Sequence, residues 1–149
     1  MQIQQISVFL ENNAGRLAEV TRVLASAGVN IRAISIADTA DFGILRLIVN
    51  KTDDAVAALS KAGFTARLTA VMAVEIGDEP GSLASVMELF RETGVNIEYL
   101  YASLEGCTGK AVVIFKVENL EHGLKIVNEK GMKIIRFSGI REFISMMLK

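Results

Sequence analysis

The tetrapeptide GVNI at residues 28–31 occurs again at residues 94–97, and this repeat decides how the chain is organised. The same shift of 66 positions aligns the stretch ENNAGRLA, residues 11–18, with GDEPGSLA, residues 77–84. A glycine, a leucine and an alanine coincide within these stretches, so the similarity extends well beyond four residues. Two copies at so long a period indicate a duplicated domain, because a solenoid needs three or more stacked repeats.

Each copy predicts the same order of secondary structure. An apolar or alternating run opens the copy as a strand, and an amphipathic helix follows it and ends at the glycine of GVNI. Two strands joined by a polar turn, a second helix and a fourth strand complete the copy. The predicted strands are residues 2–10, 30–37, 43–49 and 64–68 in the first copy and 69–76, 96–103, 109–117 and 132–137 in the second. Thr52 and Asn119 are predicted to cap the second helix of each copy.

The order βαββαβ in each copy predicts an α+β fold of the ferredoxin-like type, with an antiparallel sheet and both helices on one face. We expect a first domain at residues 1–68, a second at 69–137 and a short C-terminal helical extension at 138–149. No linker rich in glycine, serine or proline separates the domains, which predicts a fixed relation between them.

The third strand of each copy carries apolar residues on both of its alternating faces, at residues 45–49 and 111–115. Helices cover only one face of a ferredoxin-like sheet, so the other face needs a second cover. The sister domain or a second chain could provide it. We therefore expect a compact, pseudo-symmetric pair of domains and a homodimer.

The composition excludes several classes of partner. Of the 149 residues, 51% are hydrophobic and 22% are charged, and the formal net charge is -1. This balance predicts a globular core and no nucleic-acid or anionic-membrane partner. The sequence has neither a signal-like start nor an apolar run near the roughly 20 residues that span a bilayer, so we expect a cytoplasmic protein. Cys107 is the only cysteine, which leaves no intrachain disulfide.

The aligned stretches ENNAGRLAEVTRVLASAGVNI and GDEPGSLASVMELFRETGVNI resemble the ACT domain, a small regulatory module that binds amino acids. Each has a polar loop after the first strand, a glycine and leucine where the helix starts, and GVNI before the second strand. The resemblance covers nearly the whole chain and implies a tandem ACT protein with no enzyme attached. It also implies a free amino acid as ligand, bound at a domain interface, with no catalytic residue, no metal and no cofactor.

Transferred residue by residue, the resemblance implies two groups of ligand-binding residues. The first comprises Asn12, Asn13, Ala14, Gly15, Leu17, Asn30 and Ile31, and the second comprises Asp78, Glu79, Pro80, Gly81, Leu83, Asn96 and Ile97. Two departures stand out. The family's proline before the glycine is present as Pro80 but replaced by Ala14, which predicts a less rigid first loop. Asp78 stands where the first loop has Asn12, and its charge would repel a ligand carboxylate.

The chemistry of these residues suits a zwitterion. A helix N-terminus offers free N–H groups to a carboxylate, glycine allows close approach, and asparagine both donates and accepts hydrogen bonds. A structural explanation of the same residues stays open: Gly15 and Gly81 could simply make tight turns, and Asn30 and Asn96 could simply follow helix caps.

The other motifs say less about function. The triplet Asp41-Phe42-Gly43 matches a kinase signature but lacks the accompanying catalytic set, so we interpret it as a hairpin turn. His122 is expected to be solvated in the first turn of a helix. A small ferredoxin-like enzyme with a dispersed site and a purely structural dimerisation module remain the alternatives to a regulatory protein.

Overall fold

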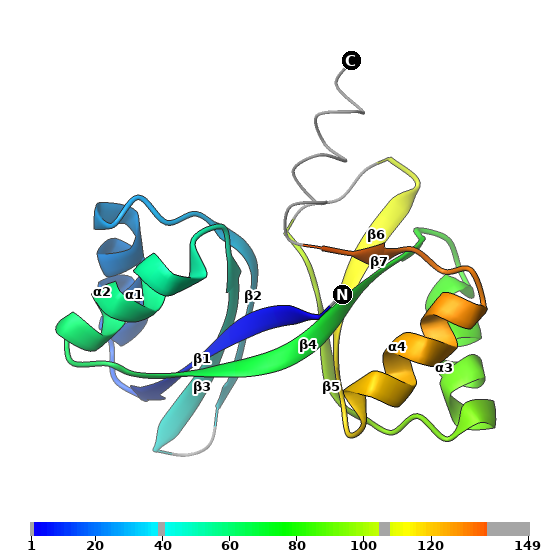
Figure 1. Cartoon of the computed structure of the whole chain (residues 1–149). Coiled ribbons are helices and arrows are strands. Elements are labelled where there is room, and N and C mark those ends of the chain that lie inside the picture. Colours follow the sequence, from blue (N-terminus) through cyan, green and yellow to red (C-terminus); the bar gives the residue numbers. More distant parts are fainter. Residues whose placement is uncertain (1, 39–40, 105–107, 137–149) are drawn as a thin grey trace. The chain divides into compact units, whose positions relative to one another are not determined.

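The computed structural model describes residues 2–38, 41–104 and 108–136 and divides the chain into two compact units (Figure 1). The N-terminal unit spans Gln4–Thr69, and the C-terminal unit starts at Ala70 and also includes Met1–Ile3. The helix predicted at residues 138–149 lies outside the described residues.

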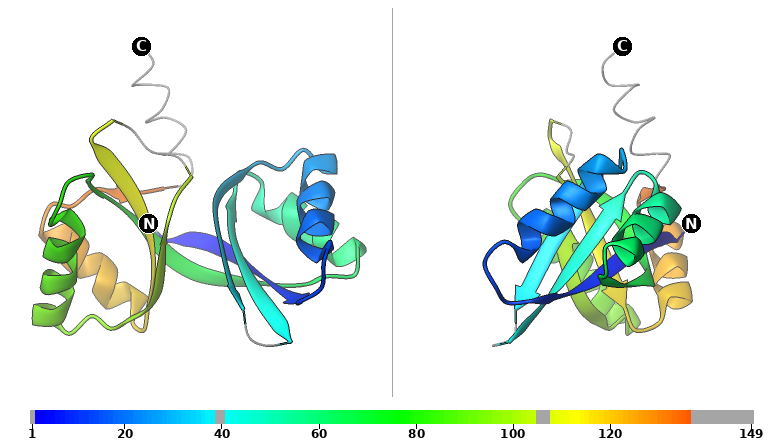
Figure 2. Two further views of the ribbon diagram at one scale, coloured as in Figure 1. Left: turned by 180° about the vertical axis from the view of Figure 1, so that it is seen from behind. Right: turned by 90° about the vertical axis from the view of Figure 1, so that its left-hand side faces the viewer.

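The N-terminal unit contains the predicted βαββαβ order. Its strands form an open sheet in the order β2-β3-β1-β4, and β3 pairs antiparallel with both β1 and β2. Its elements are β1 (Ile3–Glu11), α1 (Arg16–Ser26), β2 (Ile31–Asp38), β3 (Phe42–Val49), α2 (Thr52–Lys61) and the first residues of β4 (Thr65–Gly77). The helices α1 and α2 contact each other and cover one face of this sheet (Figure 2).

The C-terminal unit repeats this arrangement. Strand β4 pairs with β6 and β7, and β6 pairs with β5, all antiparallel, which gives the order β7-β4-β6-β5. The further elements are α3 (Ser82–Thr93), β5 (Ile97–Ala102), β6 (Lys110–Val117), α4 (Leu120–Glu129) and the short strand β7 (Ile134–Ile135). The predicted α+β fold of two ferredoxin-like domains is therefore confirmed.

One strand differs from the sequence-based expectation. Residues 64–68 and 69–76 are predicted as two strands, but β4 runs without interruption from Thr65 to Gly77 and crosses the boundary between the units. No glycine or proline lies within residues 65–76, so nothing in the sequence ends the first strand before the second begins.

Each unit has its own core between the sheet and its two helices. In the N-terminal unit, Leu24 of α1 and Leu59 of α2 pack against Leu45 and Leu47 of β3, and all four are fully buried. In the C-terminal unit, the Phe90 ring of α3 meets the Phe115 ring of β6 edge to face, with centroids 5.4 Å apart. The alternate strand positions, among them Ala33, Ile48, Ala73 and Ile114, lie on the face away from the helices. Each sheet therefore carries apolar residues on both faces, as the sequence predicts.

The second helix of each unit ends in the same way. Gly63 and Gly131 adopt φ values of 89° and 68°, and the next residue donates its N–H back into the helix. Phe64 donates to the carbonyl of Leu59 at 2.9 Å, and Met132 donates to that of Val127 at 3.1 Å. Phe64 and Met132 are therefore structurally equivalent.

The starts of these helices differ. Asn119 caps α4 as predicted, because its side chain accepts a hydrogen bond from the backbone N–H of His122 at 3.0 Å. The prediction for Thr52 is wrong: Thr52 is already the first residue of α2, and its N-cap, Lys51, forms no side-chain cap.

Candidate functional site

The loop between β1 and α1 carries the first group of predicted ligand-binding residues. The backbone N–H of Asn12 donates to the carbonyl oxygen of Asp41 at 3.0 Å, which joins this loop to the start of β3. The Asn13 amide donates to a carboxylate oxygen of Glu11 at 3.1 Å. Gly15 precedes the helix with φ of 89°, a left-handed conformation that only glycine adopts readily. The backbone conformation therefore favours glycine at this position whether or not a ligand binds.

The loop between β4 and α3 has the same geometry. The backbone N–H of Asp78 donates to the carbonyl oxygen of Gly109 at 3.0 Å, the equivalent of the bond in the first loop. Gly81 has φ 91° and ψ -13°, and Gly15 has φ 89° and ψ -13°. The change from proline to alanine before the glycine thus leaves the entry into the helix unaltered.

Both loops lead into helices whose N-termini no side chain caps. The N-cap residues of α1 and α3 are Gly15 and Gly81, and neither helix has a side-chain cap hydrogen bond. The first N–H groups of an α-helix have no acceptor within the helix, and they form its positive end. The two loops therefore present hydrogen-bond donors to an anionic group.

A pocket of about 120 Å³ lies against the first loop. Three of its residues belong to the predicted set: Asn12, Asn13 and Leu17. The others are Leu10, Glu11, Arg16, Ile36 and Gly43. None of these five is among the predicted site residues. Ile36 and Gly43 reach the pocket through the pairing of β1 and β2 with β3.

Asn30 and Asn96 lie at the other end of each sheet, where the second strand begins. The backbone N–H of Asn30 donates to the side-chain oxygen of Asn50 at 2.8 Å, and the Asn50 N–H donates back to the Asn30 carbonyl at 3.1 Å. The Asn96 side chain donates to a carboxylate oxygen of Glu118 at 3.1 Å. Both asparagines therefore join the start of one strand to the end of its neighbour.

Within one unit, the loop and the asparagine cannot meet. Asp38 pairs with Gly43 at the loop end of the sheet, whereas Ile31 pairs with Val49 at the asparagine end. At roughly 3.3 Å per residue, these two ends of β2 are about 20 Å apart. A small ligand that contacts both groups must therefore take the loop from one domain and the asparagine from another.

A second pocket, of about 500 Å³, surrounds Asn96 in the C-terminal unit. It is lined by Gly94, Val95, Asn96, Glu118, Asn119, Leu120 and His122. His122 is half-buried and not fully solvated as expected, and its Nε2 lies 2.8 Å from the carbonyl oxygen of Thr93. The first turn of α4 places this ring against the last residue of α3, and periodicity within one helix cannot reveal that contact.

The remaining predicted residues divide into exposed and core positions. Leu17 and Leu83 are 40% and 39% exposed, which is high for leucine at the start of a helix. Ile31 and Ile97 are half-buried and pack against the cores of their units. Ala14, Glu79 and Pro80 are exposed in the loops. The described residues contain no group of three or more His, Cys, Asp and Glu side chains that could hold a metal ion.

The fold and the paired loops define a duplicated ferredoxin-like domain, and comparison with known proteins gives its family. The chain belongs to the family of ACT domain pairs, whose model matches residues 1–144. It is also similar to protein BT0572 from Bacteroides thetaiotaomicron, with 38% identity over 94% of this chain and 96% of that one and a TM-score of 0.88.

A more distant structure shares the fold. The ligand-free regulatory subunit of aspartate kinase from Thermus thermophilus is 23% identical over 85% of this chain and 90% of that one, with a TM-score of 0.61. No curated protein matches significantly. Within the residues that the structure describes, no helix is long and apolar enough to cross a membrane. The fold and family support a regulatory ligand-binding module.

Proposed function

We propose that this chain is a non-enzymatic regulatory protein that binds a small free amino acid at an interface between ACT domains. The observation that carries the proposal is the pocket beside Asn12 and Asn13, which lies next to the uncapped N-terminus of α1. In this proposal the loop comes from one domain, and Asn30 or Asn96 comes from another domain in the same chain or in a second copy.

The pocket offers a partner for each part of a zwitterion. The Arg16 N–H donates to the Asn13 carbonyl oxygen at 3.3 Å, and the N–H groups that follow it in the first turn of α1 suit a carboxylate. The Glu11 carboxylate, which also lines the pocket, suits an ammonium group, and the two asparagine amides can donate or accept. The second loop has Asp78 and Glu79 at the positions of these asparagines, so it binds a carboxylate more weakly.

The size of the pocket limits the ligand. A volume of about 120 Å³ is small beside the roughly 300–1,000 Å³ of typical ligand pockets. Glycine, alanine and serine suit this space better than aromatic amino acids do. A few contacts to so small a ligand give weak binding, so groups from a second domain should add to the affinity.

A homodimer is the simplest source of the second domain. Binding would then strengthen the contact between subunits, and a partner protein could respond to the change. The size of this response cannot exceed the difference in ligand affinity between the two states.

A thermal-shift screen with the twenty amino acids tests this proposal. At a hundredfold excess over Kd, binding adds about 2.7 kcal/mol, which raises the melting temperature of a chain of this size by roughly 5–11 °C. We expect the largest shift with a small amino acid. The absence of a shift with every amino acid at millimolar concentration would contradict the proposal. Sedimentation with and without the ligand then tests the homodimer.

Two variants separate ligand binding from structure. Asn30→Ala and Asn96→Ala should each lower the affinity for the ligand, and the double variant should have the lowest affinity. Glu118→Ala is the matched control, because it removes the hydrogen-bond partner of Asn96 but leaves the asparagine in place. If the asparagine variants lower stability as Glu118→Ala does and leave the affinity unchanged, their role is structural only.

A further inference from the structure

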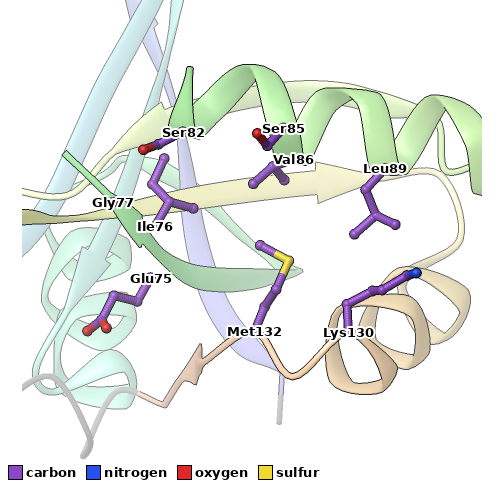
Figure 3. Close-up of a pocket in the computed structure, with 9 residues that line it drawn as sticks. All are labelled: Glu75, Ile76, Gly77, Ser82, Ser85, Val86, Leu89, Lys130 and Met132. Atoms are coloured by element: carbon purple, nitrogen blue, oxygen red, sulfur yellow. The ribbon is translucent and has the colours of Figure 1, made fainter. Parts of the chain in front are cut away.

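The C-terminal unit contains a pocket of about 530 Å³ on the helix side of its sheet (Figure 3). It adjoins the loop between β4 and α3 through Gly77 and Ser82, but neither the loop residues 78–81 nor Asn96 lines it. Its lining residues come from the end of β4, from α3 and from the turn after α4. Ile76 and Val86 are buried core residues, and Leu89 and Met132 are half-buried against the same core. These four side chains give the pocket an apolar floor. We name it the α3–α4 pocket.

The N-terminal unit fills the equivalent position with its own side chains. Arg16, the first residue of α1, lies over the Phe64 ring, with its guanidinium carbon 4.6 Å from the ring centroid. Its guanidinium also forms a salt bridge of 2.6 Å with Glu19. The three side chains form a closed cluster, held by a cation–π contact and an ion pair.

All three residues are replaced in the C-terminal unit. The repeat places Ser82 and Ser85 at the positions of Arg16 and Glu19, and Met132 is equivalent to Phe64 at the end of the second helix. The long cation, its carboxylate partner and the aromatic ring are therefore absent together. The α3–α4 pocket is the space that they would occupy.

The same set of changes introduces a charge at the rim. Lys130 is the C-cap residue of α4, and the C-cap residue of α2 is Ala62. In Figure 3 the Lys130 side chain extends along the rim beside Leu89, whereas the Glu75 carboxylate points away from the other side chains. Glu75 pairs with Val112 in the register of β4 and β6, on the strand positions that alternate with the core. Lys130 thus places a positive charge at one end of the rim, while Glu75, which also lines the pocket, directs its carboxylate away from the other side chains.

We propose that the α3–α4 pocket binds a small molecule with an apolar body and a single anionic end group, such as a medium-chain carboxylate. The apolar body lies on Ile76, Val86, Leu89 and Met132, and the anionic group lies at the Lys130 ammonium. The Ser82 and Ser85 side chains border the opposite side of the pocket, where the Ser85 hydroxyl donates to the Gly81 carbonyl oxygen at 3.0 Å. This ligand and this site differ from the amino acid and the interface site proposed above, and neither proposal depends on the other.

Octanoate is a suitable probe, with octan-1-ol as its uncharged counterpart and octylamine as its cationic one. Titration of the full chain, followed by NMR of the methionine and leucine methyl groups, should show saturable binding of octanoate with a Kd of about 1 mM or tighter. The ε-methyl of Met132 and the methyls of Leu89 should shift the most. Octan-1-ol should bind more weakly than octanoate, and octylamine should bind the least.

Variants locate the site and test its charge. Lys130→Gln should lower the affinity for octanoate about two- to fivefold, as expected for an exposed ion pair. The triple variant Ser82→Arg, Ser85→Glu and Met132→Phe copies the cluster of the N-terminal unit. It should lower the affinity for octanoate more than tenfold. In the opposite direction, Arg16→Ser, Glu19→Ser and Phe64→Met with Ala62→Lys should create a second site and raise the stoichiometry from one to two.

The outcomes are distinct. Absence of saturable binding, or methyl shifts confined to residues away from Met132 and Leu89, would overturn the proposal. Equal affinity of a folded triple variant and the natural chain would also overturn it. Equal binding of octanoate and octan-1-ol, together with no effect of Lys130→Gln, would overturn the proposal as well, because the anionic group is part of it. Because the NMR measurement uses the natural chain, failure of a variant to fold leaves the test intact.

Discussion

The two units share one fold but differ in what occupies the space beside the first helix. The N-terminal unit closes this space with Arg16, Glu19 and Phe64, whereas the C-terminal unit leaves a pocket of about 530 Å³. The backbone is equivalent where the first helices start, since the glycines there have nearly the same dihedral angles. At this place the side chains of the two copies differ while the backbone is the same. Function in a duplicated domain is therefore sought where the copies differ.

The cores provide the comparison with the largest expected effect. Phe90 and Phe115 form an edge-to-face pair, and Leu24 and Leu47 occupy the equivalent positions in the N-terminal unit. Phe90→Ala should cost about 3–5 kcal/mol, because it leaves a cavity in a closed core. Phe90→Leu copies the other unit and should cost less than about 1.5 kcal/mol. Urea unfolding measures both, and equal losses would show that the aromatic ring itself, and not the filled volume, stabilises this core.

The helix-start glycines should respond alike. Gly15→Ala and Gly81→Ala should each lower stability by about 1–2 kcal/mol, because alanine is strained in the left-handed region. At this chain length the loss corresponds to roughly 2–8 °C in melting temperature by calorimetry. A loss in only one unit would show that the alanine or proline before the glycine changes the loop after all.

The caps of the second helices should respond differently. Asn119→Ala removes the hydrogen bond to the His122 N–H and should cost about 1 kcal/mol. Lys51→Asn introduces the same residue type at the N-cap of α2, which has no side-chain cap, and should raise stability by up to about 1 kcal/mol. Denaturant midpoints measure both. If Lys51→Asn destabilises the chain, the two helix starts differ in more than their cap residue.

The Arg16 cluster should contribute the least. The Arg16 and Glu19 side chains are 30% and 51% exposed, so solvent screens their ion pair and Arg16→Ser should cost about 1 kcal/mol or less. Arg16→Lys keeps the charge but loses the planar contact with Phe64. Comparison with Arg16→Ser therefore separates the contribution of the ion pair from that of the ring contact. The difference between Arg16→Lys and Arg16→Ser should shrink in 1 M salt. A cost that is independent of salt would assign the effect to packing.

The fold could be predicted from the sequence because its signals are local and occur twice. Strand alternation, helical spacing and the glycine of GVNI recur in register, so each copy supports the interpretation of the other. The continuity of β4 across the domain boundary could not be predicted. No turn residue lies at that boundary, so the sequence does not show whether one strand or two strands cover these residues. The Thr52 cap was misjudged for a related reason: threonine suits both the N-cap and the first helical position, and only the backbone decides.

The candidate site was predictable only in part. Family resemblance indicates Asn12 and Asn13, and both line a pocket, but the sheet places Asn30 at the far end of the same domain. The contact of Arg16 with Phe64 joins residues that lie far apart in the sequence, so no local pattern reveals it. Its loss in the other copy becomes visible only when both turns are compared in three dimensions.

The positive φ angles at Gly15 and Gly81 have a stereochemical consequence. A Cβ atom built on either glycine meets no heavy atom within 4 Å, so the obstacle to a side chain is handedness and not volume. A D-alanine would find its preferred conformation at both positions. Chemical synthesis of the chain with D-alanine there should therefore raise its stability, because the unfolded chain loses the freedom that glycine gives it while the native backbone stays unstrained.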